Sequence, residues 1–597
     1  MNNPQQFYKK RLAEETDKVH ILSQKSHWFI LIEISCFIVL LLSVVLAFWT
    51  SMISLWTVVG LLSICIWGLT TKIDVRNERT IKACQAVCDV YQHEMEYHKG
   101  DFHAFQSYKD YTDSHHEYSY DLDIFGPDML FSRLNRTVTT GGSDQLAYWF
   151  QHLSRDDERQ KAVSELSQKE EFVTVFKSQK YTDNNIVNTD KVQHAIDNLF
   201  HLSIPSFLVS KPMFYFAWLA IIGFILFVIL SLFHIVSGTA ALWWGVLQFF
   251  AVFFLCSKII RSIGNVIGNL KEDLIGYIQL ISLVEHANFE VNRNNEIKQK
   301  LDGAMLSFSQ LDSYLKGLDS RNNIFGLVIM NVLFLNDFFL VRKFNRWQKE
   351  NQATMSQWIK ATSTMDAYVS LATMVYNHPE TVWPKIIGGN KIVYKAKGLY
   401  HPFLGEHAVR NDFEIKDHNY YIITGANMAG KSTFLRALGI NYVMAMVGLP
   451  VFAEQYEVSC FNLFSSMRTQ DDLNRGISYF NAELLRLKQL IHSCKLSQLP
   501  TLIILDEILK GTNSVDKLNG SHLFLEAISK MNVSGVIATH DLELSKMSVE
   551  QPDVFHNYCF EIQLDSSITY SYKVTPGVAR NQNATYLLKK ILKENQP

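Results

Sequence analysis

Residues 424–433, TGANMAGKST, combine glycines, a lysine and hydroxyl side chains at the spacing of a phosphate-binding loop. The surrounding run NYYIITGANMAGKSTFLRALG predicts an apolar strand, this loop and then a helix. The glycines let backbone N–H groups turn inward onto phosphate oxygens, while the lysine supplies charge to the β and γ phosphates. The first hydroxyl after the lysine can ligate Mg2+. The loop therefore predicts a site for ATP and Mg2+ formed by Gly425, Ala426, Asn427, Met428, Ala429, Gly430, Lys431, Ser432 and Thr433.

Two carboxylates follow a second apolar strand, in TLIILDEILKGT. In a parallel sheet the carboxyl end of such a strand lies beside the phosphate loop. Asp506 suits Mg2+ through a water molecule, and Glu507 suits general-base activation of the attacking water. A third strand, GVIATHD, ends at His540, which could contact the γ-phosphate or be structural. These residues predict ATP hydrolysis, with Lys431, Glu507 and His540 as catalytic candidates and Ser432 and Asp506 as metal ligands.

The pattern of apolar residues along the sequence changes near residue 390. Beyond it, short runs rich in Ile, Val and Tyr alternate with helix-like stretches, which predicts an α/β domain with a mainly parallel sheet over residues 390–597. Residues 74–385 have helical periodicity and few Gly or Pro. The predicted fold class is thus an α/β P-loop ATPase domain joined to an all-α domain that carries four transmembrane helices.

Four long apolar runs support the membrane part of this prediction. They form two close pairs, Trp28–Trp49 with Ile53–Leu69 in an N-terminal segment 1–73, and Met213–Phe233 with Ala240–Ile260 inserted in the helical domain. Buried core helices are the alternative. The links within each pair carry no Lys or Arg, whereas the flanks are basic. The positive-inside bias predicts an integral protein of a plasma membrane, such as a bacterial inner membrane, with both termini and the ATPase domain cytoplasmic.

Composition adds few constraints. The chain has 597 residues and a formal net charge of -2, so no overall basicity points to nucleic acid. Cys84 and Cys88 lie one helical turn apart, but no second pair accompanies them. Reduced thiols are therefore a better interpretation of the eight cysteines than a metal site.

The nucleotide motifs resemble one family closely. TGANMAGKST resembles the T-G-P-N-M-G-G-K-S-T loop of the MutS mismatch-repair family, with departures at Ala426 and Ala429. DDLNRGISYFNAELLRL, LDEILKGTNSVDKLNG and IATHDLEL are similar to the three segments that follow in that family, and the likeness covers about residues 395–590. A weaker resemblance to the family's helical core and lever domain extends over about residues 117–385.

The resemblance implies a homodimer with shared ATP sites. The phosphate loop and Asp506-Glu507 leave the γ-phosphate facing solvent, where the charge of the transition state would be poorly stabilised. In the resembling family the loop GISYFNAELLRL reaches the ATP of the neighbouring subunit, which implies that Ser478 completes the partner's site and that Asp516 lines the seam. The alternative is that Ser478 caps its own helix.

Departures from the family leave the substrate open. Residues 1–120 contain no F-x-E mismatch-reading motif, and no strand-rich DNA clamp is evident in residues 263–385. One prediction is a membrane-anchored, MutS-like ATPase that binds DNA, as in mismatch repair, at the cytoplasmic face. The other is an ATP-driven membrane machine, for transport or signalling, whose protein partners are unknown and whose substrate is not DNA. The transporter motif L-S-G-G-Q is not found before the Asp-Glu strand, which favours the MutS lineage.

Overall fold

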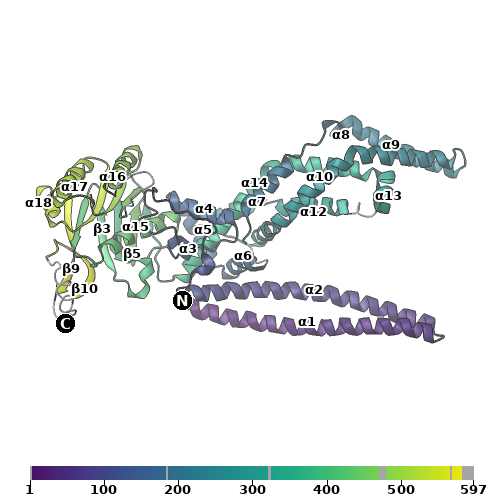
Figure 1. Ribbon diagram of the computed structural model, residues 1–597, viewed down its shortest axis with the longest axis horizontal. Coiled ribbons are helices and arrows are strands. Elements are labelled where there is room, and N and C mark those ends of the chain that lie inside the picture. Colours follow the sequence, from purple (N-terminus) through teal and green to yellow (C-terminus); the bar gives the residue numbers. More distant parts are fainter. Residues whose placement is uncertain (1–2, 183–185, 320–323, 469–478, 565–567, 581–597) are drawn as a thin grey trace.

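The computed structural model describes residues 3–182, 186–319, 324–468, 479–564 and 568–580. An α/β domain lies at one end of the long axis, a helical body lies in the middle, and two helical hairpins extend toward the other end (Figure 1). The helices before the α/β domain are α1 (Pro4–Trp49), α2 (Ile53–Tyr97), η1 (His103–Phe105), α3 (Leu130–Leu134), α4 (Thr140–Gln151), α5 (Asp157–Ser167), α6 (Glu170–Thr182), α7 (Thr189–Phe200), α8 (Ser206–Val209), α9 (Lys211–Leu232), α10 (Gly238–His286), α11 (Asn292–Lys300), α12 (Ala304–Asp319), α13 (Ile324–Phe334) and α14 (Asn336–Asn377).

The described strands of the α/β domain form two sheets. Its strands are β1 (Lys385–Ile387), β2 (Val393–Leu399), β3 (Asn411–Lys416), β4 (Tyr420–Gly425), β5 (Gln455–Ser459), β6 (Asn462–Ser466), β7 (Thr501–Asp506), β8 (Val533–Thr539), β9 (Phe555–Leu564) and β10 (Ile568–Pro576). Its helices are η3 (Pro402–His407), α15 (Lys431–Val447), α16 (Tyr479–Leu496), α17 (Ser514–Ile528), η5 (Leu542–Lys546) and α18 (Met547–Glu550).

The larger sheet has the order β10-β9-β4-β8-β7-β6. All neighbours in it are parallel except β9 and β10. Strand β4, YYIITG, is buried along its whole length, which is typical of a parallel strand covered on both faces. The register places Thr424 opposite Thr539 and Asp506 opposite Ala538, so the carboxyl ends of β4, β7 and β8 meet at one edge. The predicted α/β domain with a mainly parallel sheet is confirmed.

A smaller sheet, ordered β1-β5-β2-β3, completes the domain. The helical body is organised around α14, which packs against α4, α5, α7, α10, α11 and α12. One continuous core of buried apolar residues runs from this body into the α/β domain, and Leu122 from the body reaches the backbone of α15 at Gly439. A Cβ at Gly439 would lie 2.6 Å from a Leu122 methyl carbon, so the two units are closely packed there.

Within the described part of the chain, four helices are long and apolar enough to cross a membrane: α1, α2, α9 and the first part of α10. They contain the four runs predicted from the sequence except Phe233, which immediately follows α9. The two hairpins that they form extend in the same direction from the helical body (Figure 1). Helices α1, α2 and α10 continue past the apolar runs, and α2 crosses residues 73 and 74 without a break, so the expected segment boundary falls within a helix.

A buried ionic cluster attaches the first hairpin to the body. Glu94, near the end of α2, is 1% exposed and accepts hydrogen bonds from Arg136 and Lys177, each at 3.0 Å, and from Asn377 at 2.9 Å. Tyr8 of α1 donates to the same Asn377 at 2.7 Å. Although burial acts to raise it, the charges of Arg136 and Lys177 hold the pKa of Glu94 well below its ordinary value. Removing one member would leave uncompensated buried charge, so the cluster fixes both helices of the hairpin in place.

Candidate nucleotide site

The loop between β4 and α15 has the backbone of a phosphate-binding loop. Gly430, immediately before α15, has a φ of 103°, and a Cβ there would lie 3.0 Å from the Tyr572 ring. The left-handed conformation therefore favours glycine at this position, and the Tyr572 ring leaves little room for a side chain. Met428 also has a positive φ, 66°, and its side chain is exposed. The N-terminus of α15 opens directly onto the loop, which is the usual arrangement for binding an anion.

Lys431 is held inside the loop. Its Nζ donates to the carbonyl oxygens of Gly425 at 2.8 Å and Ala426 at 2.9 Å, and the residue is 5% exposed. Burial lowers the pKa of Lys431 to about 8, although Asp506 and Glu507 act in the opposite direction. The protonation state of the Lys431 amine therefore depends on the charge of what binds in the loop.

The two predicted metal ligands lie together. The Ser432 hydroxyl donates to Asp506 Oδ2 at 2.5 Å, which brings oxygens from α15 and β7 to one point. Hydroxyl and carboxylate oxygens are the ligands that Mg2+ prefers, so this donor set fits that ion.

Glu507 and His540 occupy the same edge of the sheet. Glu507 has a φ of 62°, and its backbone N–H donates to the Ala538 carbonyl at 2.9 Å. Its carboxylate accepts a hydrogen bond from Lys517 of α17 at 2.9 Å. Burial raises the pKa of Glu507, but the contact with Lys517 outweighs this and leaves it below its ordinary value. Desolvation and the charge of Lys431 lower the pKa of His540, which favours the neutral imidazole at pH 7. The positive φ of Glu507, which is not a glycine, is a conformation found most often at functional sites.

These groups line one cavity of about 670 Å³. Asn427 to Thr433, Asp506, Glu507 and His540 all contribute to its wall, so most of the residues predicted from the sequence are brought together. Gly425 and Ala426 contribute carbonyls that hold Lys431. The sequence interpretation missed the other half of the wall, which is formed by Tyr400, His401, Leu404, His407, Val409, Asn411, Lys510, Phe560 and Tyr572. Four of these residues, Tyr400, His401, Leu404 and His407, come from the stretch YHPFLGEH. Its aromatic, histidine and leucine side chains, just before β3, were the signal that the sequence offered.

Two predicted residues lie elsewhere. Asp516 is in the first turn of α17, where its backbone N–H donates to the Asn513 side chain at 2.9 Å and its carboxylate accepts from the same amide at 2.8 Å. It does not line the cavity of its own chain. Ser478 lies outside the described residues.

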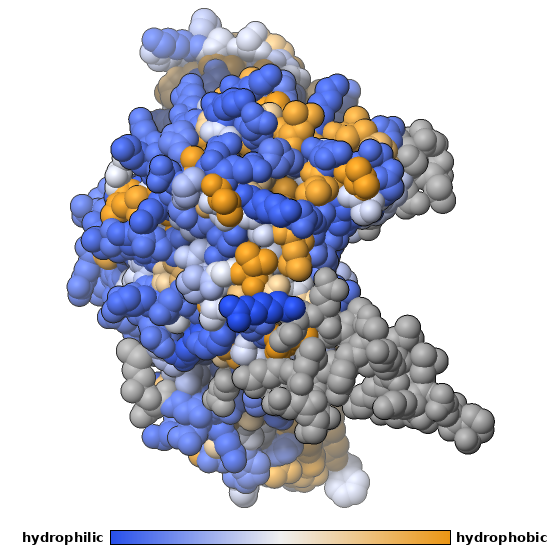
Figure 2. All heavy atoms as spheres, turned by 90° about the vertical axis from the view of Figure 1, so that its left-hand side faces the viewer, coloured by the Kyte–Doolittle hydropathy of each residue, from blue (hydrophilic) through white to orange (hydrophobic). Residues whose placement is uncertain are grey.

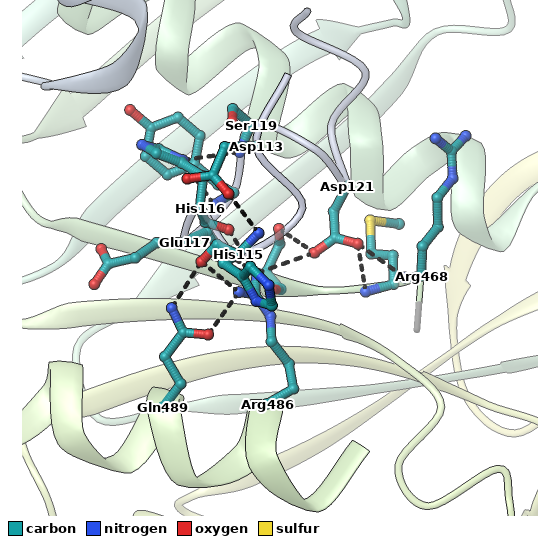
Figure 3. A network of polar contacts seen from close by, with 12 residues as sticks. Asp113, His115, His116, Glu117, Ser119, Asp121, Arg468, Arg486 and Gln489 are labelled. Atoms are coloured by element: carbon teal, nitrogen blue, oxygen red, sulfur yellow. Dashed lines mark hydrogen bonds and ion pairs between the residues drawn. The ribbon is translucent and has the colours of Figure 1, made fainter. Parts of the chain in front are cut away.

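A buried junction connects this domain to the helical body (Figure 3). Asp121, which is 2% exposed, accepts hydrogen bonds from the Ser465 hydroxyl at 3.0 Å and from the backbone N–H of Met467 at 3.2 Å and Arg468 at 2.8 Å. Arg486 of α16 donates to Asp121 at 3.4 Å. The same guanidinium donates to the carbonyl oxygens of His115, His116 and Glu117 at 3.2, 2.9 and 2.9 Å.

The junction also contacts the helix of the phosphate loop. Arg436 of α15 donates to the Asp121 carbonyl at 3.1 Å and pairs with Asp123 at 3.3 Å. On the other side, Glu483 of α16 accepts from the backbone N–H of Lys510 and Gly511, each at 3.0 Å, in the loop that follows Glu507. The segment 113–123 is therefore bonded to two helices, α15 and α16, that both begin near the nucleotide site.

The site and the sheet around it define a P-loop domain. Residues 421–590 match the family model described as MutS domain V, and this part of the chain is an ATPase domain. Such domains use ATP and Mg2+.

Curated relatives agree over the same region. The chain is 30% identical to a DNA mismatch repair protein MutS of Thermosipho melanesiensis over 36% of this chain and 26% of the relative. It is 27% identical to that of Petrotoga mobilis over 36% of this chain and 27% of the relative. The protein of the same name from Macrococcus caseolyticus is 25% identical over 54% of this chain and 35% of the relative, a match longer than the whole α/β domain. The chain thus spans about a quarter to a third of the length of these relatives.

The buried state of Lys431 predicts a pH-dependent affinity for ATP. Phosphate binds the protonated lysine, so above its pKa of about 8 binding must take up a proton. Above about pH 7.5 affinity should fall, approaching about tenfold per pH unit near pH 9.5. Equilibrium titration of ATP without Mg2+ over this range provides the measurement.

Lys431→Arg is the matched control, because a guanidinium stays charged across this range. Its affinity should be lower but independent of pH. An equal pH dependence in both proteins would assign the titration to another group.

Proposed function

We propose that this protein is a membrane-anchored ATPase of the MutS type, in which ATP binding and hydrolysis change the conformation of the helical body at the cytoplasmic face. One observation carries the proposal: segment 113–123, which follows the first hairpin in the chain, is bonded to both α15 and α16 of the ATPase domain. A change at the phosphate loop or at Glu507 would reach this segment through directional, partly buried contacts.

The chemistry follows from the positions of the side chains. Lys431 would bind the β and γ phosphates, and Ser432 with Asp506 would hold Mg2+, which neutralises phosphate charge when bound. Glu507 would accept a proton from the attacking water, since its lowered pKa keeps it ionised at pH 7. The neutral imidazole of His540 would donate to the γ-phosphate. Aromatic and aliphatic side chains on the opposite wall, such as Tyr400 and Leu404, suit the nucleotide base.

We further propose a homodimer with shared sites. Proteins of the MutS family typically dimerise. Asp516 does not line the cavity of its own chain, and it lies at the start of a helix that exposes Val515 and Leu523 at 65% and 69%. Apolar side chains interrupt the mainly hydrophilic surface at this end of the molecule (Figure 2). Exposed apolar side chains beside an open site suit contact with a second copy, which would supply Ser478.

Shared sites predict complementation between two inactive variants. Ser478→Ala and Lys431→Ala should each lose most activity as homodimers. In a heterodimer, one site combines the intact Lys431 of one chain with the intact Ser478 of the other, so about half of the parental activity should return. ATPase assays on heterodimers isolated with two different affinity tags provide the measurement.

The two variants purified separately and mixed without subunit exchange serve as the control. Verified heterodimers that stay inactive would show instead that Ser478 acts within its own chain.

The proposed anchoring uses both hairpins. Helices α1, α2, α9 and α10 carry apolar runs of spanning length, and the basic residues at their flanks favour cytoplasmic termini. Both hairpins extend in one direction from the body, as two insertions into a single bilayer would require (Figure 1).

Two substrate classes remain for the motor. The curated relatives are named for DNA mismatch repair, and the longest of the three alignments extends into the helical region, which favours DNA as the substrate. The hairpins favour the second class, a membrane machine that acts on a protein or a transported solute.

DNA should stimulate hydrolysis several-fold if it is the substrate. Binding to the phosphate backbone releases counterions, so the stimulation should weaken as salt rises from about 50 mM to about 200 mM. The assay uses the full chain in lipid vesicles with duplex or branched DNA, and heparin controls for general polyanion binding. Equal rates with and without DNA at every salt concentration would favour the second class.

A further inference from the structure

Helix α13 is apolar on every side and yet largely exposed. Its sequence is IFGLVIMNVLF, with Asn331 as its one amide side chain. The exposed fractions of its large side chains include 74% at Ile324, 78% at Phe325, 51% at Ile329 and 53% at Phe334. A helix that is apolar all round belongs in a protein core or in lipid, and these side chains are more than half exposed.

The helix lies against the second hairpin. It packs on α9 and α10, and in Figure 1 it projects to one side of the hairpin that they form. Gly245 of α10 permits the contact, because a Cβ there would lie 3.1 Å from Val332 and 3.0 Å from Phe224. Phe224 is about 20 Å along α9 from its first residue, at 1.5 Å per residue. The end of α13 therefore reaches the depth at which α9 would be in hydrocarbon.

The bend after α13 frees backbone groups, and buried amide side chains satisfy them. The chain turns by 80° between α13 and α14 at Leu335, which has a φ of 48°. Gln248 of α10, 5% exposed, donates to the Val332 carbonyl at 2.9 Å. Asn331, 2% exposed, accepts from the backbone N–H of Asp337 at 2.9 Å. Broken helices are tolerated at membrane depth only where neighbouring groups replace the lost backbone bonds in this way.

A second contact orders the donor itself. The Trp244 indole N–H lies 3.2 Å from both Gln248 Oε1 and the Ala220 carbonyl of α9. The amide of Gln248 is thus oriented by one spanning helix while it bonds to the end of α13. In an aqueous environment, a water molecule could donate directly to the Val332 carbonyl. A side-chain donor such as Gln248 is needed where water is excluded.

Arg342 marks the polar boundary of the same region. Its guanidinium donates to the carbonyl oxygens of Leu208 at 2.8 Å and Ser210 at 2.9 Å, immediately before α9 begins. A cation at the start of a spanning helix is typical of the headgroup level. Leu335 lies seven residues before Arg342 in the chain, so the bend and α13 lie on the membrane side of that level.

We propose that α13 is a fifth membrane-embedded segment, which lies against the second hairpin within the hydrocarbon of the bilayer and contacts lipid acyl chains. It does not cross the bilayer, because 11 residues are too short and the chain bends back into α14. The proposal rests on the proposed insertion of α9 and α10. If so, α14, the central helix of the body, begins inside the membrane. Movement of the body would then change the position of α13 in the lipid.

A photo-crosslinking experiment identifies what contacts α13. The photoreactive residue p-benzoylphenylalanine is placed at Phe325 or at Ile329 in the full chain, reconstituted in vesicles of phosphatidylethanolamine and phosphatidylglycerol. After illumination, mass spectrometry of the protein should show phospholipid adducts at both positions. Leu219 of α9, 66% exposed, serves as the lipid-facing reference, and Val549 of the ATPase domain, 81% exposed, serves as the water-facing reference.

The outcomes separate this proposal from the one on which it rests. Adducts at Leu219 but not at Phe325 and Ile329 would contradict only the proposal that α13 lies in the hydrocarbon. Adducts at neither α9 nor α13 would overturn the membrane anchoring and α13 with it. Crosslinks from Phe325 to a second copy would show that a protein surface, and not lipid, covers the helix.

Discussion

The carboxylate of Asp121 is the interaction on which the arrangement of the molecule depends. It is buried, and its hydrogen bonds come from the end of β6 and from α16, whereas its own segment belongs to the helical body. A buried carboxylate that loses its donors costs several kcal/mol, on the order of 3–5. The end of β6 and the segment 113–123 are therefore constrained to move together, and the ATPase domain cannot rotate freely on the body.

This constraint gives the nucleotide site a mechanical connection. Arg436 lies on the helix that begins with Lys431, and Glu483 holds the loop that follows Glu507. Both contacts converge on residues 113–123 through α15 and α16. The Glu94 cluster attaches the first hairpin to the body. Helix α14 extends from the body to the second hairpin. Each link is a buried or partly buried polar contact with defined partners, so the nucleotide site, the body and the first hairpin are connected by directional bonds.

The sequence predicted the parts of this structure that local patterns determine. The phosphate loop, the Asp506-Glu507 pair and the four apolar runs each occupy one short stretch, so spacing and hydropathy were sufficient. Helix α13 was missed because 11 apolar residues are too few for a spanning segment. The contacts of Asp121 were missed because they join residues more than three hundred positions apart. The bond between Lys517 and Glu507 depends on how α17 returns over β7, which no local pattern specifies.

The most direct test of the account is whether ATP binding changes the distance between the two hairpins. Donor and acceptor fluorophores are introduced through unnatural amino acids at Met52 and Ile235, which lie in the links within the hairpins, and labelled protein is diluted with unlabelled protein in vesicles. The Glu507→Gln background, which should bind ATP and hydrolyse it slowly, holds the bound state. The account predicts an ATP-dependent change in transfer efficiency that is lost when Asp121→Asn is added while ATP binding persists. An unchanged distance in the Glu507→Gln protein, or the same change with and without Asp121→Asn, would contradict it.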